Sequence, residues 1–141
     1  MNEKQQSEVL LEELLIFAQK MLGSHGEFHP FGVYMKPTGE VVHVGVQVDL
    51  GRVSSQQRLD SLGDALKKIA LQSTVIAVGI ASNVTLSRKD GRHVDAIKCF
   101  LEHRDGYCAD VFTCYELEAA EVKISDTSAQ QGRPSVFTKA Q

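Results

Sequence analysis

Cys108, His103 and Asp110 are the residues of this chain whose types and spacing come closest to catalytic chemistry. They flank the pair Asp105-Gly106, which predicts a tight hairpin turn, and a two-residue turn would place His103 directly opposite Cys108. A thiol beside an imidazole base, with a carboxylate to orient that base, can act as a covalent nucleophile. Such a site also needs a cleft and an oxyanion hole, neither of which the sequence indicates. A half-buried cysteine at the end of a sheet is therefore the alternative interpretation.

A second group of potential ligands lies in the segment after the first predicted helix. His25, Glu27 and His29 carry the imidazole and carboxylate groups that zinc and other divalent ions bind. Two histidines four residues apart share a face only on a helix, and the surrounding glycine and proline residues predict a loop. A solvated polar loop is the alternative interpretation. No glycine-rich phosphate-binding loop follows an expected strand, so the sequence predicts no cofactor.

The composition predicts one domain that is not attached to a membrane. With 141 residues, of which 43% are apolar, the chain is long enough to bury a single core. Its 15 basic residues are scattered and its net charge is -3, which argues against a nucleic-acid partner. No apolar run reaches the roughly 20 residues that span a bilayer, and residues 2 to 8 are too polar for a targeting signal. Three cysteines without a C-x-x-C pair favour reduced thiols and a cytoplasmic location.

Periodicity predicts two helices and five strands. Apolar residues recur at helical spacing from Ser7 to Leu22, where Gly23 ends the pattern, and again from a capping box of Ser54 and Gln57 to near Ser73. Strands are expected at residues 31–36, at residues 40–50 and in three runs between residues 74 and 115. The order α-β-β-α-β-β-β is typical of an α+β domain. We expect a five-stranded antiparallel sheet with two helices on one face.

Two Asp-Gly pairs set the expected register of the last three strands. As two-residue turns, Asp90-Gly91 and Asp105-Gly106 would place Ile80 opposite Leu101. This register collects the large apolar residues on one side of the sheet, which we expect to face the core. These residues are Ile76, Val78, Ile80, Val84, Leu86, Ile97, Cys99, Leu101 and Phe112.

The opposite side of the expected sheet carries small residues beside aromatic ones. A sheet face of this composition allows another molecule to approach closely. We therefore expect an interface there, for a homodimer or for another protein, and an ordinary solvated face is the alternative. The residues of this predicted interface are Ala77, Gly79, Ala81, Phe100, Tyr107, Val111 and Tyr115.

The composition turns polar after Tyr115. Residues 125–134 are rich in Ser, Gln, Gly and Thr and show no periodicity, which is typical of a mobile segment. We therefore expect a single domain over residues 1–124 and a polar tail over residues 125–141. Val136 and Phe137 interrupt this polarity, and either dock the tail onto the domain or belong to a frayed terminus.

Five short motifs follow one another over nearly the whole chain: His29-Pro30-Phe31-Gly32, Thr38-Gly39-Glu40, Asp95-Ala96-Ile97, Glu102-His103-Arg104-Asp105-Gly106-Tyr107 and Gly132-Arg133-Pro134-Ser135-Val136-Phe137. The set resembles the motifs of a group of small uncharacterised bacterial proteins. That resemblance implies a bacterial, cytoplasmic source and a docked tail, and it transfers no catalytic residue. The order of elements is also similar to that of roadblock and profilin-like modules, which dimerise or bind partners through their sheets.

The sequence therefore predicts a small cytoplasmic protein that is a non-enzymatic binding or regulatory module and associates through the outer face of its sheet. Two alternatives stay open. One is a small thiol-dependent enzyme that uses Cys108 with His103, and the other is a divalent-metal-binding protein that uses His25 and His29.

Overall fold

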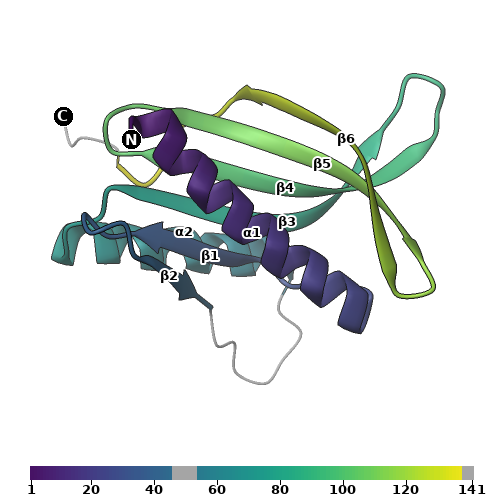
Figure 1. Ribbon diagram of the computed structural model, residues 1–141, viewed down its shortest axis with the longest axis horizontal. Coiled ribbons are helices and arrows are strands. Elements are labelled where there is room, and N and C mark those ends of the chain that lie inside the picture. Colours follow the sequence, from purple (N-terminus) through teal and green to yellow (C-terminus); the bar gives the residue numbers. More distant parts are fainter. Residues whose placement is uncertain (46–53, 138–141) are drawn as a thin grey trace.

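The two helices lie on opposite faces of one antiparallel sheet, with α1 crossing the front of the sheet and α2 behind it (Figure 1). The computed structural model describes residues 1–45 and 54–137. The six strands of the sheet follow the order β2-β1-β3-β4-β5-β6. The elements are α1 (Glu3–His25), β1 (Phe31–Met35), β2 (Val41–Val44), α2 (Ser55–Gln72), β3 (Ala77–Ser87), β4 (His93–His103), β5 (Cys108–Glu118) and β6 (Glu121–Gln131).

The α+β class and the antiparallel sheet are confirmed, whereas two details of the predicted architecture are wrong. The sheet has six strands in place of five, because β6 begins within the predicted domain at Glu121 and continues to Gln131, through the first part of the expected polar tail. The helices cover opposite faces, which the prediction did not allow for, because β3 presents apolar surface on both sides: Gly79 faces Leu14 of α1, whereas Val78 and Ile80 pack with α2. None of the described helices has the length and apolar character needed to cross a bilayer.

Capping side chains fix where both helices begin. The Asn2 side chain accepts a hydrogen bond from the Gln5 N–H at 2.8 Å, and Oε1 of Gln5 accepts one from the Asn2 N–H at 2.9 Å. The same reciprocal pair forms between Ser54 and Gln57, as predicted, and starts α2. The predicted end of the first helix at Gly23 is wrong, because α1 continues to His25 and is capped by Gly26, whose φ of 74° suits the left-handed cap.

The hairpin between β1 and β2 closes through a turn in which Gly39 adopts a φ of 92°. The Lys36 N–H donates to the Glu40 carbonyl at 2.9 Å and ends the pairing at this turn. Of the strand predicted over residues 40–50, the structure shows Val41–Val44. Val46, Val48 and Leu50 lie outside the described residues.

The predicted register of β3, β4 and β5 is wrong by one residue. Arg88 pairs with Arg92 and His103 pairs with Tyr107, so each turn holds three residues with a glycine of positive φ as the last. When the pairing of two strands shifts by one residue, side chains of the two strands that were predicted to share a face of the sheet lie on opposite faces. The residue opposite Ile80 is accordingly Phe100, in place of the predicted Leu101.

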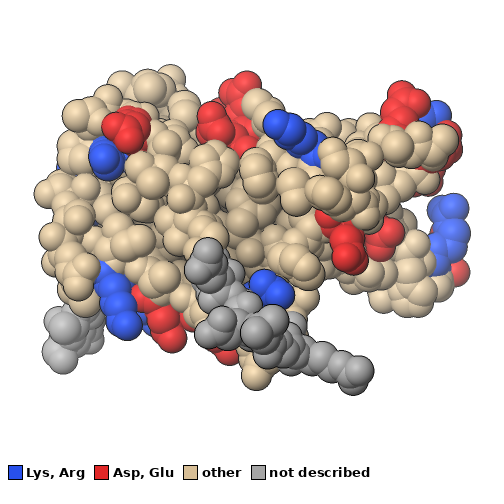
Figure 2. Space-filling view, turned by 90° about the horizontal axis from the view of Figure 1, so that it is seen from below, with Lys and Arg blue, Asp and Glu red and all other residues tan. Residues whose placement is uncertain are grey.

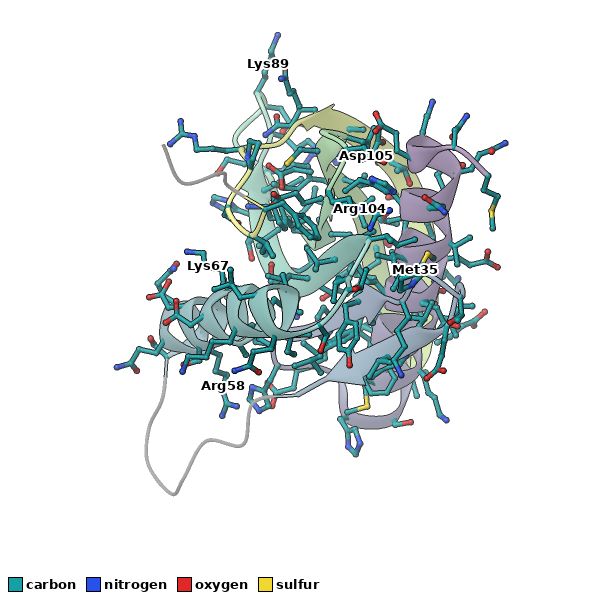
Figure 3. The ribbon with its side chains drawn as sticks, turned by 90° about the vertical axis from the view of Figure 1, so that its left-hand side faces the viewer. Met35, Arg58, Lys67, Lys89, Arg104 and Asp105 are labelled. Atoms are coloured by element: carbon teal, nitrogen blue, oxygen red, sulfur yellow. The ribbon has the colours of Figure 1, made fainter. Side chains whose placement is uncertain are left out.

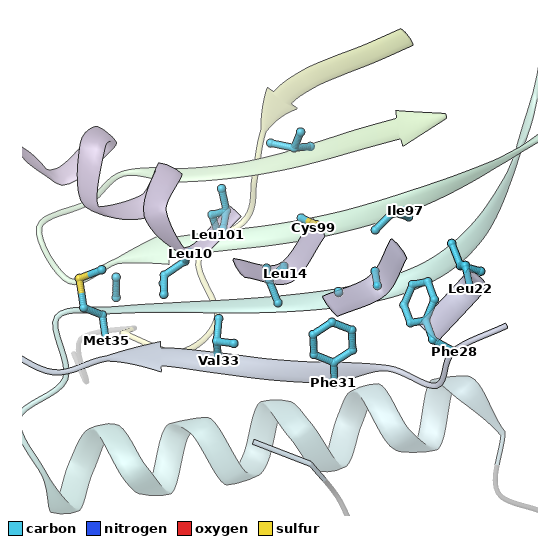
Figure 4. Packing of buried hydrophobic residues seen from close by; sticks show 14 of the residues in the cluster. Leu10, Leu14, Leu22, Phe28, Phe31, Val33, Met35, Ile97, Cys99 and Leu101 are labelled. Atoms are coloured by element: carbon cyan, nitrogen blue, oxygen red, sulfur yellow. The ribbon is translucent and has the colours of Figure 1, made fainter. Parts of the chain in front are cut away.

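The main core lies between α1 and the sheet. Small residues on β3 let the helix approach, and a Cβ added at Gly79 would lie only 2.9 Å from Cδ1 of Leu14. Leu101 and Cys99 reach this side from β4, where the prediction put them inward, while Val78 and Ile80 face α2. Figure 4 shows the packing of this cluster, which includes Leu10, Leu14, Leu22, Phe28, Phe31, Val33, Met35, Ile97, Cys99 and Leu101.

A second, smaller cluster lies between α2 and the other face of the sheet. Leu62 and Leu66 of α2 pack there with Val78 and Ile80 of β3. Val136, which lies beyond the last strand, is also buried in this cluster. Residues 125–131, expected to be part of a mobile tail, instead pair with β5 as the second half of β6. Every residue of β6 except Val122 is exposed, so most of this edge strand can be polar, and this is why periodicity did not reveal it.

Candidate functional site

A groove of about 790 Å³ lies between α2 and the adjacent face of β3, β4 and β5. α2 packs over β1 and β3, so the neighbouring part of the sheet is left for solvent and for the groove. From α2 the groove is lined by Gln56, Leu59, Asp60, Gly63, Asp64 and Lys67. The sheet contributes Ile80, Ser82, Lys98, Phe100 and Asp110, and the segment after β6 contributes Arg133 and Ser135.

The floor of the groove has an apolar centre, where two large side chains face each other across β3 and β4. Ile80 is paired with Phe100, and Phe100 is paired in turn with Asp110 on β5. On the opposite wall Gly63 leaves space, since a Cβ added there would meet no atom within 4 Å. The groove therefore has room for a side chain above the Ile80–Phe100 pair.

The lining of the groove carries charges of both signs, and two of the charged residues, Lys98 and Asp110, lie on the sheet beside Phe100. Asp60, Asp64 and Asp110 are acidic, whereas the cations come from one residue each of α2, β4 and the segment after β6: Lys67, Lys98 and Arg133. Within the described ranges, no ion pair joins any two of these six side chains. Figure 3 shows Lys67 on the side of α2 opposite to Arg58. The groove thus presents charges that are free to pair with a ligand.

The segment after β6 is held in place by the carboxylate of Glu102. Oε1 of Glu102 accepts the N–H groups of Ser135 and Val136 at 2.9 and 2.8 Å, and Oε2 accepts that of Phe137 at 2.8 Å. Glu102 is only 2% exposed. Sequence reasoning missed this role, because a glutamate near the end of a strand gives no signal of its partner. The only hint was that its motif and the Val136-Phe137 motif occur together.

The predicted thiol site is not assembled, because its residues lie on different faces of the sheet. Cys108 is paired with Glu102 and shares its face, whereas the next residue on β4, His103, contacts Gln6 of α1. Asp110 lines the groove on the same face as Cys108. Burial, together with the negative charges of Glu102 and Asp110, raises the pKa of Cys108 to about 11. The thiol is therefore protonated at neutral pH and lacks the predicted base.

His103 has a structural environment instead of a catalytic one. Its Nε2 donates to Oε1 of Gln6 at 2.7 Å, and its Nδ1 accepts the Asp105 N–H at 3.1 Å. Burial lowers the pKa of His103, and the nearby carboxylate of Asp105 opposes that shift. A neutral imidazole with both nitrogens bonded joins α1 to the turn between β4 and β5.

The predicted metal ligands are spread along the end of α1 and the loop that follows. His25 belongs to the last turn of the helix, and Glu27 and His29 are exposed beyond it. In the described part of the chain, the one group of three such ligand atoms within 4.8 Å of one another is Glu3, His103 and Asp105. Both nitrogens of His103 are already engaged, so this group offers no free imidazole.

The predicted interface is divided between two faces of the sheet, which corrects that prediction. Its small residues lie beneath α1, where Ala77 and Ala81 have no exposed surface and Gly79 touches Leu14. Val111 and Tyr115 are buried on the same side. Phe100 lies on the other face, in the floor of the groove, and Tyr107 lies between β4 and β5. The error of one residue in the predicted register exchanged the two faces of β4 relative to those of β3 and β5.

No known family model, curated protein or solved structure matches this chain. The interpretation of the groove therefore rests on its own geometry.

Proposed function

We propose that this protein is a non-enzymatic binding module that holds a peptide segment of a partner protein in the groove between α2 and β3–β5. The observation that carries this proposal is the combination of the apolar Ile80–Phe100 pair with six charged lining residues that do not pair with one another among the described residues. Apolar anchors in a groove with charged rims are a recurring mode of peptide recognition. The apolar floor supplies affinity and the charges select the partner.

The mixture of charges favours a peptide over a nucleic acid. Three aspartates line the same groove as the three cations, and they would repel a phosphate backbone. On the face of the molecule shown in Figure 2, acidic and basic side chains are interspersed and form no basic stripe. A peptide can carry both signs of charge on neighbouring residues and so match both walls.

The protein's own chain already uses this face to bind a short irregular segment. Residues 135–137 place Val136 in the small core and give their N–H groups to Glu102. The groove continues from that segment through Ser135 and Arg133. A partner peptide in the groove would lie beside this segment and use the same kinds of contact.

We propose the bacterial cytoplasm as the place of action, which the resemblance of the five motifs implies. The cysteines Cys99, Cys108 and Cys114 are free thiols, as a reducing compartment would keep them.

The test is a selection of binders from a displayed library of random 12-residue peptides, followed by affinity measurement on matched variants. Gly63→Trp should fill the groove and weaken selected peptides on the order of 100-fold, whereas Gly63→Ala should leave them bound. Lys67→Glu should alter affinity, and Lys68→Glu should not, because Lys67 lines the groove and Lys68 does not.

Peptides that bind Gly63→Trp as well as the unmodified protein would refute the groove as the site. If instead the protein forms a dimer that Gly63→Trp dissociates, the occupant of the groove is a second copy of this chain and not a partner's peptide.

A further inference from the structure

Glu102 is a buried carboxylate whose hydrogen bonds go to one short stretch of backbone. All three of its bonds come from Ser135, Val136 and Phe137. Within the described residues no lysine, arginine or histidine forms an ion pair with it. Burial of a charge is costly unless hydrogen bonds replace its water. Its environment is therefore complete only when residues 135–137 are docked.

Residues 133–137, here called the strap, have few other attachments. The last backbone bond of the sheet before them runs from the Gly132 N–H to the Cys108 carbonyl at 3.1 Å. Beyond it Arg133, Pro134 and Ser135 are exposed, Phe137 is half-buried, and Val136 is buried at 7% exposure. Two apolar side chains, those of Val136 and Phe137, and one carboxylate thus hold the strap to the sheet.

The strap separates two hollows. Arg133 and Ser135 line the groove, whereas Pro134 and Phe137 line a second hollow of about 450 Å³ beside the turn between β4 and β5. Glu102 forms part of the second hollow as well. Detachment of the strap would join the two hollows and would remove Arg133 from the groove wall.

We propose that Glu102 is a latch that positions the strap as a detachable wall of the groove. The latched strap supplies Arg133, and the groove then accepts a peptide with an acidic residue at that end; this second step rests on the function proposed above. In the released state water replaces the three N–H groups around Glu102, and the groove loses its Arg133 wall. Glu102 is a positioning residue, since it acts on the groove through the strap.

The direct test is residue-level amide hydrogen exchange by NMR, which needs no ligand. Glu102→Ala and Val136→Ser should each speed exchange at Ser135, Val136 and Phe137 on the order of 10- to 100-fold. Amides at the centre of β3, which is paired on both sides, should keep their protection. Glu116→Gln is the matched control, because it removes an exposed carboxylate of β5 and should change no strap amide.

Glu102→Gln distinguishes a latch from simple packing. The glutamine oxygen can still accept the N–H groups of Ser135 and Val136, but its NH2 group would face the N–H of Phe137 and cannot accept it. Exchange should therefore rise most at Phe137. If the three amides are as well protected in Glu102→Gln and in Glu102→Ala as in the unmodified protein, the latch is overturned. Loss of protection throughout the sheet in these variants would also overturn it.

Failure of the latch and failure of the groove give different results. A 12-residue peptide selected on the unmodified protein should bind Glu102→Ala and Arg133→Ala more weakly, each on the order of 10-fold. Unchanged affinity with accelerated strap exchange would overturn control of the groove by the latch. If the library yields no groove-dependent peptide while the strap amides respond as described, the proposed function fails and the latch stands.

Discussion

The two faces of the sheet use the same strands but are closed to different degrees. On one face α1 contacts β1, β3, β4 and β6 and seals the main core. On the other face α2 contacts β1 and β3, and the remaining surface belongs to the groove and to the strap. The larger buried core lies on the α1 face, while the groove proposed to receive a partner lies on the α2 face.

Side-chain volume on β3 accounts for this difference. Ala77, Gly79 and Ala81 face α1 and let its leucines approach the strand backbone. Val78 and Ile80 face α2 and provide apolar surface of their own. A strand with small side chains on one face and large side chains on the other thus forms a tight helix–sheet core on the first face and an open apolar floor on the second.

Equivalent leucine truncations on the two faces should have unequal costs. Leu14→Ala on α1 should lower the free energy of unfolding by about 4 kcal/mol, because its packed surroundings cannot collapse into the cavity. Leu66→Ala on α2 should cost about 2 to 3 kcal/mol, since the smaller cluster borders an open groove and can relax. Both side chains have no exposed surface, so burial is matched. Urea unfolding measures both, and equal costs would contradict the comparison.

The local elements could be predicted from the sequence, because short-range contacts decide them. The capping box of Ser54 with Gln57 and the end of α2 at Ser73 both follow from residues within a few positions of each other. The strand nature of residues 41–44 and 93–103 likewise followed from alternation and turn residues.

Which side chains share a face of the sheet depended on the length of each turn, which differs from the prediction by one residue. An Asp-Gly pair suits both a two-residue turn and the last two positions of a three-residue turn, and the sequence does not separate them. The three-residue form moved Phe100 from the predicted interface to the floor of the groove. Glu102 could not be predicted as a latch either, because its partners lie 33 to 35 residues away.

Alkaline pH should also reveal the tighter packing of the α1 face. Burial raises the pKa of Cys99 from 9.0 to about 12, so folding favours the neutral thiol. Its contribution to stability is complete below pH 9 and is lost as the pH rises toward 12, on the order of 1 kcal/mol at pH 10. Urea unfolding at pH 7 and pH 10 should show this loss for the unmodified protein and a smaller one for Cys99→Ala.

Cys108→Ala is the matched variant on the α2 face. The thiol of Cys108 is half-buried, so solvent should screen the effect of burial on its ionisation. Cys108→Ala should therefore reduce the loss of stability at alkaline pH by less than Cys99→Ala does. A larger effect at Cys108 than at Cys99 would contradict the ranking of the two faces.

A buried hydroxyl makes the α1 face less stable than its packing allows. Oγ of Ser7 is buried on the inner side of α1 and has no hydrogen-bond partner among the described residues. Ser7→Ala should therefore raise the free energy of unfolding by about 1 kcal/mol, because the protein no longer buries an unpaired hydroxyl and because Ala has a higher helix propensity than Ser. Ser61→Ala, at an exposed position of α2, measures propensity alone and should give about half as much. Thermal unfolding that ranks Ser61→Ala above Ser7→Ala would show that the hydroxyl is satisfied.

The helix glycines provide the smallest contrast between the two faces. A Cβ at Gly63 of α2 meets open groove, so Gly63→Ala should stabilise the protein by about 0.5 to 1 kcal/mol through helix propensity. A Cβ at Gly23 of α1 would lie 3.3 Å from the Ala120 carbonyl oxygen, and this crowding should cancel most of the same gain. Chemical denaturation of the two variants compares them directly. A larger gain at Gly23 would mean that α1 can shift away from the turn between β5 and β6, and would argue against a rigid α1 face.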